Sequence, residues 1–238
     1  MARSVVVAGR TDAGVHATGQ VVHADVVPFS GEPTSRRLTV DERGVPDLDR
    51  MRHRWNRILP ADVRVLGVRV APEGFDARFS ATRRHYRYQV SDAPYGVDPL
   101  RRHDTLAWGR PLDVDAMNEA SEALLGLHDF AAYCKQREGA TTIRELQRLV
   151  WRRVAEHDVH VDVSADAFCH SMVRSLVGAL LLVGDGRREV AWPGTVLESQ
   201  ERASAVAPAH GLTLVGIDYP PDAELAARAQ QTRNLRTV

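Results

Sequence analysis

Strand-like and helix-like segments alternate along this chain, and that order restricts its fold more than any other feature. Two β-branched stretches, residues 4–8 and 19–27, lie on either side of a glycine-bounded loop and predict a pair of strands. A helix is predicted after Asp47, because apolar residues recur there at helical spacing and Pro60 stops the run. Residues 30–46 lack periodicity and predict an exposed connection.

The rest of the chain repeats this alternation. Alternating apolar residues predict strands at 63–70, 85–90, 146–154, 159–164 and 212–217. Helical spacing predicts helices over 113–126, 170–183 and 194–204, and the LHDF segment at 127–130 is interpreted as the start of a loop. Strand pairs that alternate with helices are typical of an α+β fold with helices packed on antiparallel sheet.

Composition excludes several classes of protein. No apolar run approaches the roughly 20 residues of a membrane span, and the first ten residues do not resemble a secretory signal. Cys134 and Cys169 are too few and too far apart in sequence to indicate a disulfide framework or a zinc site, so a reducing compartment, the cytoplasm, is expected. A net charge of zero leaves a nucleic-acid partner open, because a local basic face matters more than the sum.

The loop between the first two strands presents one carboxylate, Asp12, between Gly9 and Gly14. Glycines allow backbone conformations that hold such a side chain in a fixed pose. Spacing alone slightly favours a plain tight turn in which Asp12 accepts backbone hydrogen bonds. A metal site with His16 and His23 is not favoured, because residues 12 and 16 share a face only in a helix, which Gly14 opposes.

The whole loop sequence is far more specific than its spacing. The string GRTDAGVHATGQVVH, residues 9–23, resembles the signature segment of the tRNA pseudouridine synthase A family (tRNA-uridine isomerase I). The resemblance continues through FDARFSATRRHYRYQV at 75–90, LHDFAAYCKQ at 127–136, ADAFCHSMVRSLVGALLLVG at 165–184 and GLTLVGIDYP at 211–220. It therefore covers most of the chain.

The resemblance implies site residues one by one. The family's catalytic aspartate falls on Asp12, the tyrosine that stacks on the target base falls on Tyr86, and the arginine that pairs with the carboxylate falls on Arg174. The Asp12 carboxylate can act as the nucleophile or hold the charged intermediate, and the Tyr86 hydroxyl can help proton removal at C5 of the base. Arg10, beside the nucleophile, and His128 are implied as substrate-binding residues. From the residues alone, Arg174 would be an ordinary helix-surface arginine. Tyr86 would then be a half-buried strand tyrosine as readily as a stacking platform.

The resemblance also implies an architecture and a substrate. The expected α+β fold has two ferredoxin-like (RRM-like) lobes, 1–72 and 73–238, with the active site in the cleft between them. The expected reaction is isomerisation of uridine to pseudouridine at positions 38, 39 and 40 of the tRNA anticodon stem-loop, without metal, flavin or nucleotide cofactor. A homodimer that holds one tRNA is expected. Arg52, Arg54 and Arg57, or Arg83, Arg84 and Arg87, are candidate phosphate contacts or merely solvated faces.

One departure from the family pattern keeps other functions open. Family members carry a leading strand, a tyrosine-aspartate-glycine segment, a glycine-tryptophan-glutamine element and a helix ahead of the signature loop, whereas here one strand precedes it. We therefore expect an incomplete N-terminal lobe with an exposed sheet edge and uncovered apolar surface. The alternatives are a truncated, non-catalytic tRNA-binding protein and a hydrolase of N-glycosidic bonds that would release uracil.

Overall fold

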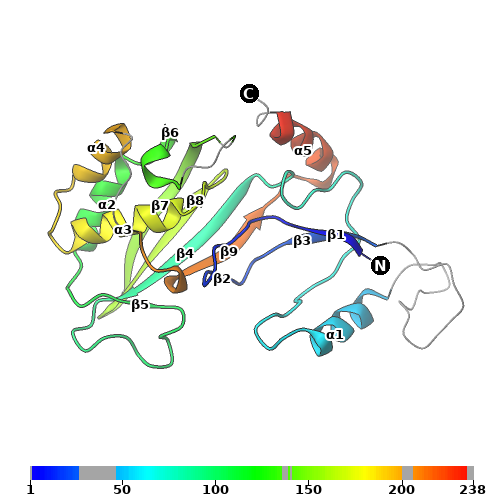
Figure 1. Ribbon diagram of the computed structural model, residues 1–238, viewed down its shortest axis with the longest axis horizontal. Helices are drawn as coiled ribbons and strands as arrows, with labels where there is room; N and C mark the ends of the chain where they lie inside the picture. The colour runs from blue at the N-terminus through cyan, green and yellow to red at the C-terminus, as the bar shows by residue number, and fades with distance from the viewer. Residues whose placement is uncertain (1, 27–46, 136–138, 140, 200–205, 235–238) are drawn as a thin grey trace, which may run out of the picture.

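The computed structural model describes residues 2–26, 47–135, 139, 141–199 and 206–234, and it has the predicted α+β fold (Figure 1). Its main sheet has the strand order β2-β9-β4-β8-β7-β6, and β5 pairs with β4. The strands are β2 (His16–Ala17), β4 (Arg83–Ser91), β5 (Leu106–Ala107), β6 (Gly126–Asp129), β7 (Ile143–Ala155), β8 (Asp158–Ala165) and β9 (Leu212–Asp218). A separate two-stranded sheet pairs β1 (Ala2–Val7) with β3 (Val22–Val26).

The core lies between the main sheet and three helices. These are α2 (Val114–Glu122), α3 (Met172–Gly184) and α4 (Trp192–Ser199), which pack together against the sheet (Figure 1). The period-two pattern of β4 buries Tyr86, Tyr88 and Val90 on one face, opposite alternate valines of β8. Because α3 is apolar on nearly all sides, it is the most buried helix and fixes the position of the residues at its N-terminus.

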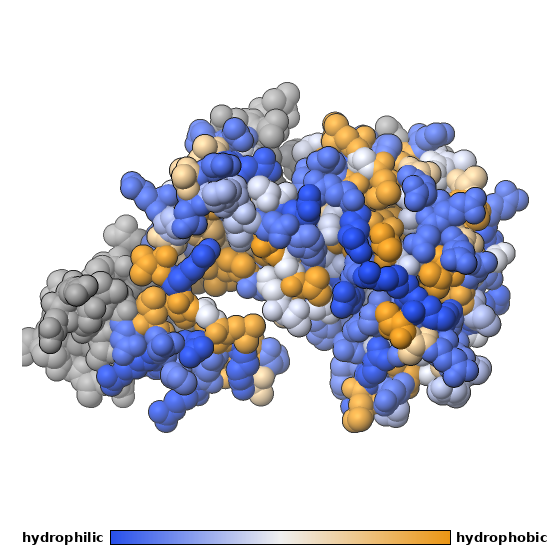
Figure 2. Space-filling view, turned by 180° about the vertical axis from the view of Figure 1, so that it is seen from behind, coloured by the Kyte–Doolittle hydropathy of each residue, from blue (hydrophilic) through white to orange (hydrophobic). Residues whose placement is uncertain are grey.

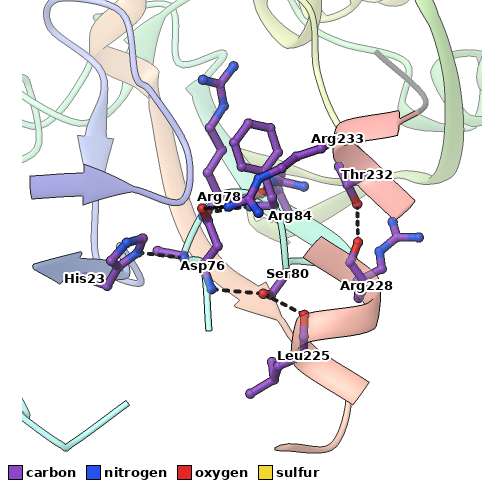
Figure 3. Close-up of polar contacts among 11 residues, drawn as sticks. His23, Asp76, Arg78, Ser80, Arg84, Leu225, Arg228, Thr232 and Arg233 are labelled. Atoms are coloured by element: carbon purple, nitrogen blue, oxygen red, sulfur yellow. Dashed lines mark hydrogen bonds and ion pairs between the residues drawn. The ribbon is translucent and has the colours of Figure 1, made fainter. Parts of the chain in front are cut away.

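The β1–β3 pair is tied to the rest of the molecule by the segment 76–80 (Figure 3). The Ala77 amide donates to His23 Nδ1 on β3, at 2.9 Å. The Asp76 carboxylate accepts from the backbone of Arg78 at 2.8 Å and from Arg233 Nη2 at 2.8 Å. Arg233 belongs to α5 (Leu225–Asn234), so this network joins three elements beside the loop that carries Asp12.

Helix α1 (Leu48–Ile58) confirms the prediction from local signals. The Asp47 side chain accepts from the Arg50 amide at 2.9 Å as an N-cap, and the helix ends before Pro60. Several apolar side chains around it are exposed, among them Ile58 at 74% and Leu66 at 76%. Figure 2 shows apolar surface around a hollow between this part of the molecule and the main sheet.

Two expectations about secondary structure are wrong, and one helix was missed. Residues 63–70 form no strand, because the Asn56 side chain takes both backbone hydrogen bonds of Val65, at 2.7 and 2.8 Å. The LHDF segment supplies strand β6, which pairs with β7, and helix α5 was not predicted. The predicted exposed connection at 30–46 lies outside the described residues, as does the end of the helix predicted at 194–204.

No helix among the described residues combines the length and apolar character needed to cross a membrane.

The short helical turns of the described residues are η1 (Ala131–Tyr133), η2 (Ala209–Gly211) and η3 (Asp222–Glu224). Of these, η1 lies next to the N-terminal end of α3, and η2 leads directly into β9.

Candidate active site

Asp12 lies at the tip of the loop between β1 and β2, as the sequence predicts. Gly14 has φ of +82°, which L side chains rarely adopt, and the Val15 amide donates to the Asp12 carbonyl at 3.1 Å. The Gln20 side chain binds both the amide and the carbonyl of Gly9, at 3.3 and 2.7 Å. The loop is therefore held at both ends, and it presents the Asp12 carboxylate with 28% of the side chain exposed.

Arg174, in the first turn of α3, pairs with this carboxylate. Its Nη1 lies 3.1 Å from Asp12 Oδ2, and its Nε donates to the Ala207 carbonyl at 2.7 Å. Only 20% of the Arg174 side chain is exposed, so the pair is shielded from most of the solvent. Two contacts on one planar guanidinium fix both its position and its orientation. The implied partnership between these two residues thus has hydrogen-bonding geometry.

Both residues face a pocket of about 730 Å³, a size typical of small-molecule sites. Its described lining comes mainly from the Asp12 loop, β4, the start of β7 and the start of α3. The cationic side chains of that lining are Arg10, Arg78, Arg84, Lys135, Arg144 and Arg174. Asp12 is the one acidic residue in the described lining, so the pocket combines a single carboxylate with a positive field that favours a polyanion.

Tyr86 forms one wall of the pocket. Its ring is 7% exposed and packs edge-to-face with Phe168, with centroids 5.2 Å apart. Burial raises the pKa of the Tyr86 phenol to about 12, while Arg84 lowers it and Asp12 raises it further. The hydroxyl is therefore protonated at neutral pH. Tyr88, in contrast, donates to the Pro208 carbonyl at 2.8 Å and belongs to the core.

Arg84 holds the start of the loop that carries Asp12. Its guanidinium donates to the carbonyls of Ala8 at 3.2 Å and Asp166 at 2.6 Å. It also donates to the carbonyl of Arg78 at 2.7 Å, and Figure 3 labels both arginines. Arg84 was one of the candidate phosphate contacts. Its side chain is buried and binds backbone carbonyls, so it has a structural role in addition to lining the pocket. Arg52 on α1 pairs instead with Asp49, at 3.2 Å.

The two predicted substrate-binding residues differ in position. Arg10 is exposed and lines the pocket. His128, on β6, is not part of the described lining; its Nε2 contacts the Leu125 carbonyl at 2.7 Å and its ring packs edge-to-face on Phe130. His128 as a contact for substrate remains a prediction.

Sequence reasoning missed two neighbours of Asp12. His170 Nε2 lies 3.3 Å from Asp12 Oδ1, and the Ser171 hydroxyl lies 3.4 Å from Oδ2. Both precede α3 directly, in the CHS triplet ahead of the apolar run. The sequence feature that could have pointed to them is their position: His170 and Ser171 are polar and lie four and three positions before Arg174, on the segment that enters α3.

The two cysteines pair, although their number and their separation in sequence did not indicate a disulfide. Cys134 and Cys169 form a disulfide, with Cα atoms 5.7 Å apart. They meet because η1 packs beside the start of α3, although 35 positions separate them in sequence. The disulfide borders the pocket through Cys169.

The alternative of a metal site at Asp12 is not supported by the side chains that it requires. His16 Nε2 contacts the His103 carbonyl at 2.6 Å, and His23 Nδ1 accepts from Ala77. The described residues contain no group of three His, Cys, Asp or Glu side chains arranged for a metal ion.

The α+β fold holds a cation-lined pocket with one carboxylate, a combination that suits an anionic substrate such as a nucleic acid. The sequence profile of the tRNA pseudouridine synthase family matches residues 120–220. A tRNA pseudouridine synthase A from Mycobacterium leprae is 55% identical over 97% of this chain and 80% of its own length. The enzymes of that name from Frankia casuarinae and Corynebacterium glutamicum are 57% and 50% identical, each over 97% of this chain and 79% of their own length. This chain belongs to the tRNA pseudouridine synthase family.

Proposed function

We propose that this protein isomerises uridine to pseudouridine at positions 38, 39 and 40 of the tRNA anticodon stem-loop. Membership of the tRNA pseudouridine synthase family supports the reaction and the class of RNA. The resemblance of the signature segments to the A family supports the anticodon positions. The observation that carries the proposal is the pairing of Asp12 with Arg174 at 3.1 Å inside a cation-lined pocket.

In the proposed reaction Asp12 is the nucleophile. Its carboxylate attacks ribose C1′, and the electron pair of the C1′–N1 bond leaves with the uracil. The uracil turns within the pocket, C5 bonds to C1′, and the ester bond to Asp12 breaks to restore the carboxylate. C5 loses a proton and N1 gains one, so the product is an isomer. The reaction involves no net oxidation or reduction, and we propose that it uses no metal, flavin or nucleotide cofactor.

The target uridine has to leave the stacked RNA to reach Asp12. Tyr86 offers a flat aromatic wall for the base, and its protonated hydroxyl is a donor and not a resting base. Arg10, exposed at the pocket, would brace the position that the base has left. The remaining cations of the lining suit the flanking phosphates, and His128 would contact the RNA outside the described lining.

The proposal extends to architecture and assembly. The pocket draws its lining from the stretch 8–15 and from segments between 78 and 212, which supports a cleft between an N-terminal lobe, 1–72, and a C-terminal lobe, 73–238. A homodimer that holds one tRNA follows from the resemblance to the A family. A tRNA substrate supports the proposal that the protein works in the cytoplasm, although the two cysteines, which form a disulfide, no longer add to it.

A tritium-release assay tests the proposed function. The substrate is tRNA labelled with tritium at uracil C5, since joining C5 to C1′ expels that atom. Wild-type protein is expected to release tritium and to retain the base, whereas Asp12→Ala releases none. Asp62→Ala is the matched control, because Asp62 is exposed and outside the described pocket lining. Mapping the product should place pseudouridine at positions 38, 39 or 40. Release of free uracil, or no tritium from folded wild-type protein, would contradict the proposal.

A further inference from the structure

The segment 169–171, which leads into α3, has a tightly determined shape. Cys169 is joined to Cys134 by the disulfide, and the His170 carbonyl accepts from the Lys135 amide at 2.9 Å. Ser171 has φ of +65°, and it is the one non-glycine residue with positive φ in the part of the chain that the structure describes. Such a conformation costs about 1–3 kcal/mol and persists only where surrounding contacts impose it. The strained backbone directs two consecutive side chains toward Asp12.

His170 and its neighbours divide the two carboxylate oxygens between them. Oδ2 of Asp12 is bound by Arg174 Nη1 at 3.1 Å and approached by the Ser171 hydroxyl at 3.4 Å. Oδ1 has a different partner, His170 Nε2, at 3.3 Å. With donors on Oδ2 alone, the carboxylate could pivot about its Cβ–Cγ bond. The His170 contact on the other oxygen removes that freedom.

The second ring nitrogen of His170 indicates where its proton lies. Nδ1 is buried and has no hydrogen-bond partner among the described residues. A buried N–H without an acceptor costs free energy, whereas an unprotonated ring nitrogen only loses a weak contact. The proton therefore lies on Nε2, the nitrogen that faces Asp12. His170 Nε2 is then the ring nitrogen placed, at 3.3 Å, to donate to Asp12 Oδ1.

We propose that His170 is a positioning residue, whose Nε2–H locks Oδ1 so that a free lone pair of Asp12 points at ribose C1′. A carboxylate has about four lone-pair sites, and three donors leave one for the attack. Nucleophilic attack needs the reacting atoms in line at about 3–3.5 Å, and a displacement of about 1 Å can cost 100-fold in rate. This role rests on the proposed function, because it concerns the same nucleophile and the same reaction.

Three substitutions test this role in the tritium-release assay under steady-state conditions. His170→Gln places an amide N–H near the position of Nε2, and it is expected to retain activity within several-fold of wild type. His170→Asn is the matched control, because its shorter amide reaches only the position of Nδ1. His170→Leu keeps an apolar side chain of similar bulk without a donor. The Asn and Leu variants are expected to lose about 10- to 100-fold in kcat with KM for tRNA nearly unchanged.

The outcomes separate this inference from the proposed function. Wild-type protein that forms no pseudouridine would contradict the proposed function itself. An active wild type with His170→Leu or His170→Asn at the same kcat would overturn the positioning role. A loss confined to KM, or equal losses for Gln and Asn, would overturn it too, because neither depends on a donor at Nε2. Thermal unfolding of each variant checks that it is folded.

Discussion

Replacing Arg174 by lysine should slow the reaction while the positive charge remains. Arg174 uses Nε for the Ala207 carbonyl at 2.7 Å and Nη1 for Asp12 at 3.1 Å, and a lysine ammonium can satisfy one of these but not both. A hydrogen bond to a charged group contributes about 1.5–3 kcal/mol, which corresponds to about 10- to 150-fold in rate. Because four-fifths of the side chain is shielded, water replaces the lost contact poorly. We expect Arg174→Lys to lower single-turnover tritium release by about 10- to 100-fold.

Arg110→Lys is the matched control for this prediction. Arg110 is exposed and outside the described pocket lining, so the same exchange there should leave the rate unchanged. Thermal unfolding should show Arg174→Lys folded, with a melting temperature lower by about 2–4 °C for a loss of about 1 kcal/mol. A rate within twofold of wild type for folded Arg174→Lys would refute the reasoning that the guanidinium orients the nucleophile.

Two further predictions concern stability. The disulfide between Cys134 and Cys169 spans 35 positions, so its reduction should lower the free energy of unfolding by about 3–4 kcal/mol. Thermal unfolding with and without reductant measures this difference, and Cys134→Ser is the control in which reductant should have no effect. Equal stability of the wild type in both conditions would contradict a stabilising disulfide. Asp92 is buried, which raises its pKa, but hydrogen bonds from Arg153 and from the Leu112 amide outweigh burial and hold the pKa below its usual value. A lowered folded-state pKa means that the stabilisation is complete above the unfolded pKa of about 3.9 and is lost as the pH falls through the folded value. Unfolding between pH 2 and 7 should therefore show wild type more stable than Asp92→Asn above about pH 4, with a difference that shrinks in acid; a difference independent of pH would count against this pairing.

Elements with strong local signals were predicted well. The N-cap Asp47 and the stop at Pro60 bound α1, and the alternating residues of 85–90 and 159–164 form β4 and β8. Failures occurred where a distant or side-chain partner decides the structure. Residues 63–70 alternate apolar side chains but form no strand. The backbone amide and carbonyl of Val65 bind the Asn56 side chain instead of a neighbouring strand. Strand β6 is only four residues long, too short for a periodic signal, and it exists because β7 pairs with it.

The candidate site likewise has features that local sequence predicts and features that depend on distant partners. The sequence alone determined that Asp12 lies in a glycine-bounded loop after a strand, because backbone freedom at Gly14 and the preceding β-branched run are local properties. The segment at residues 9–23 also determined the family, because a match of that length assigns each family residue to one position of this chain. Tyr86 was placed on a buried strand face by alternation with period two.

The family resemblance implied Arg174 as the partner of the carboxylate, but only the tertiary structure shows how it arrives there and what else surrounds Asp12. Arg174 reaches Asp12 across 162 positions of sequence, and His170 and Ser171 arrive with it. The packing of α3 on the sheet and the pairing of β2 with β9 bring these segments together. No local periodicity encodes that meeting, because it depends on how separate elements bury their apolar faces against one another. The same packing closed the disulfide beside the pocket and left His170 Nδ1 buried, with Nε2 3.3 Å from Asp12 Oδ1.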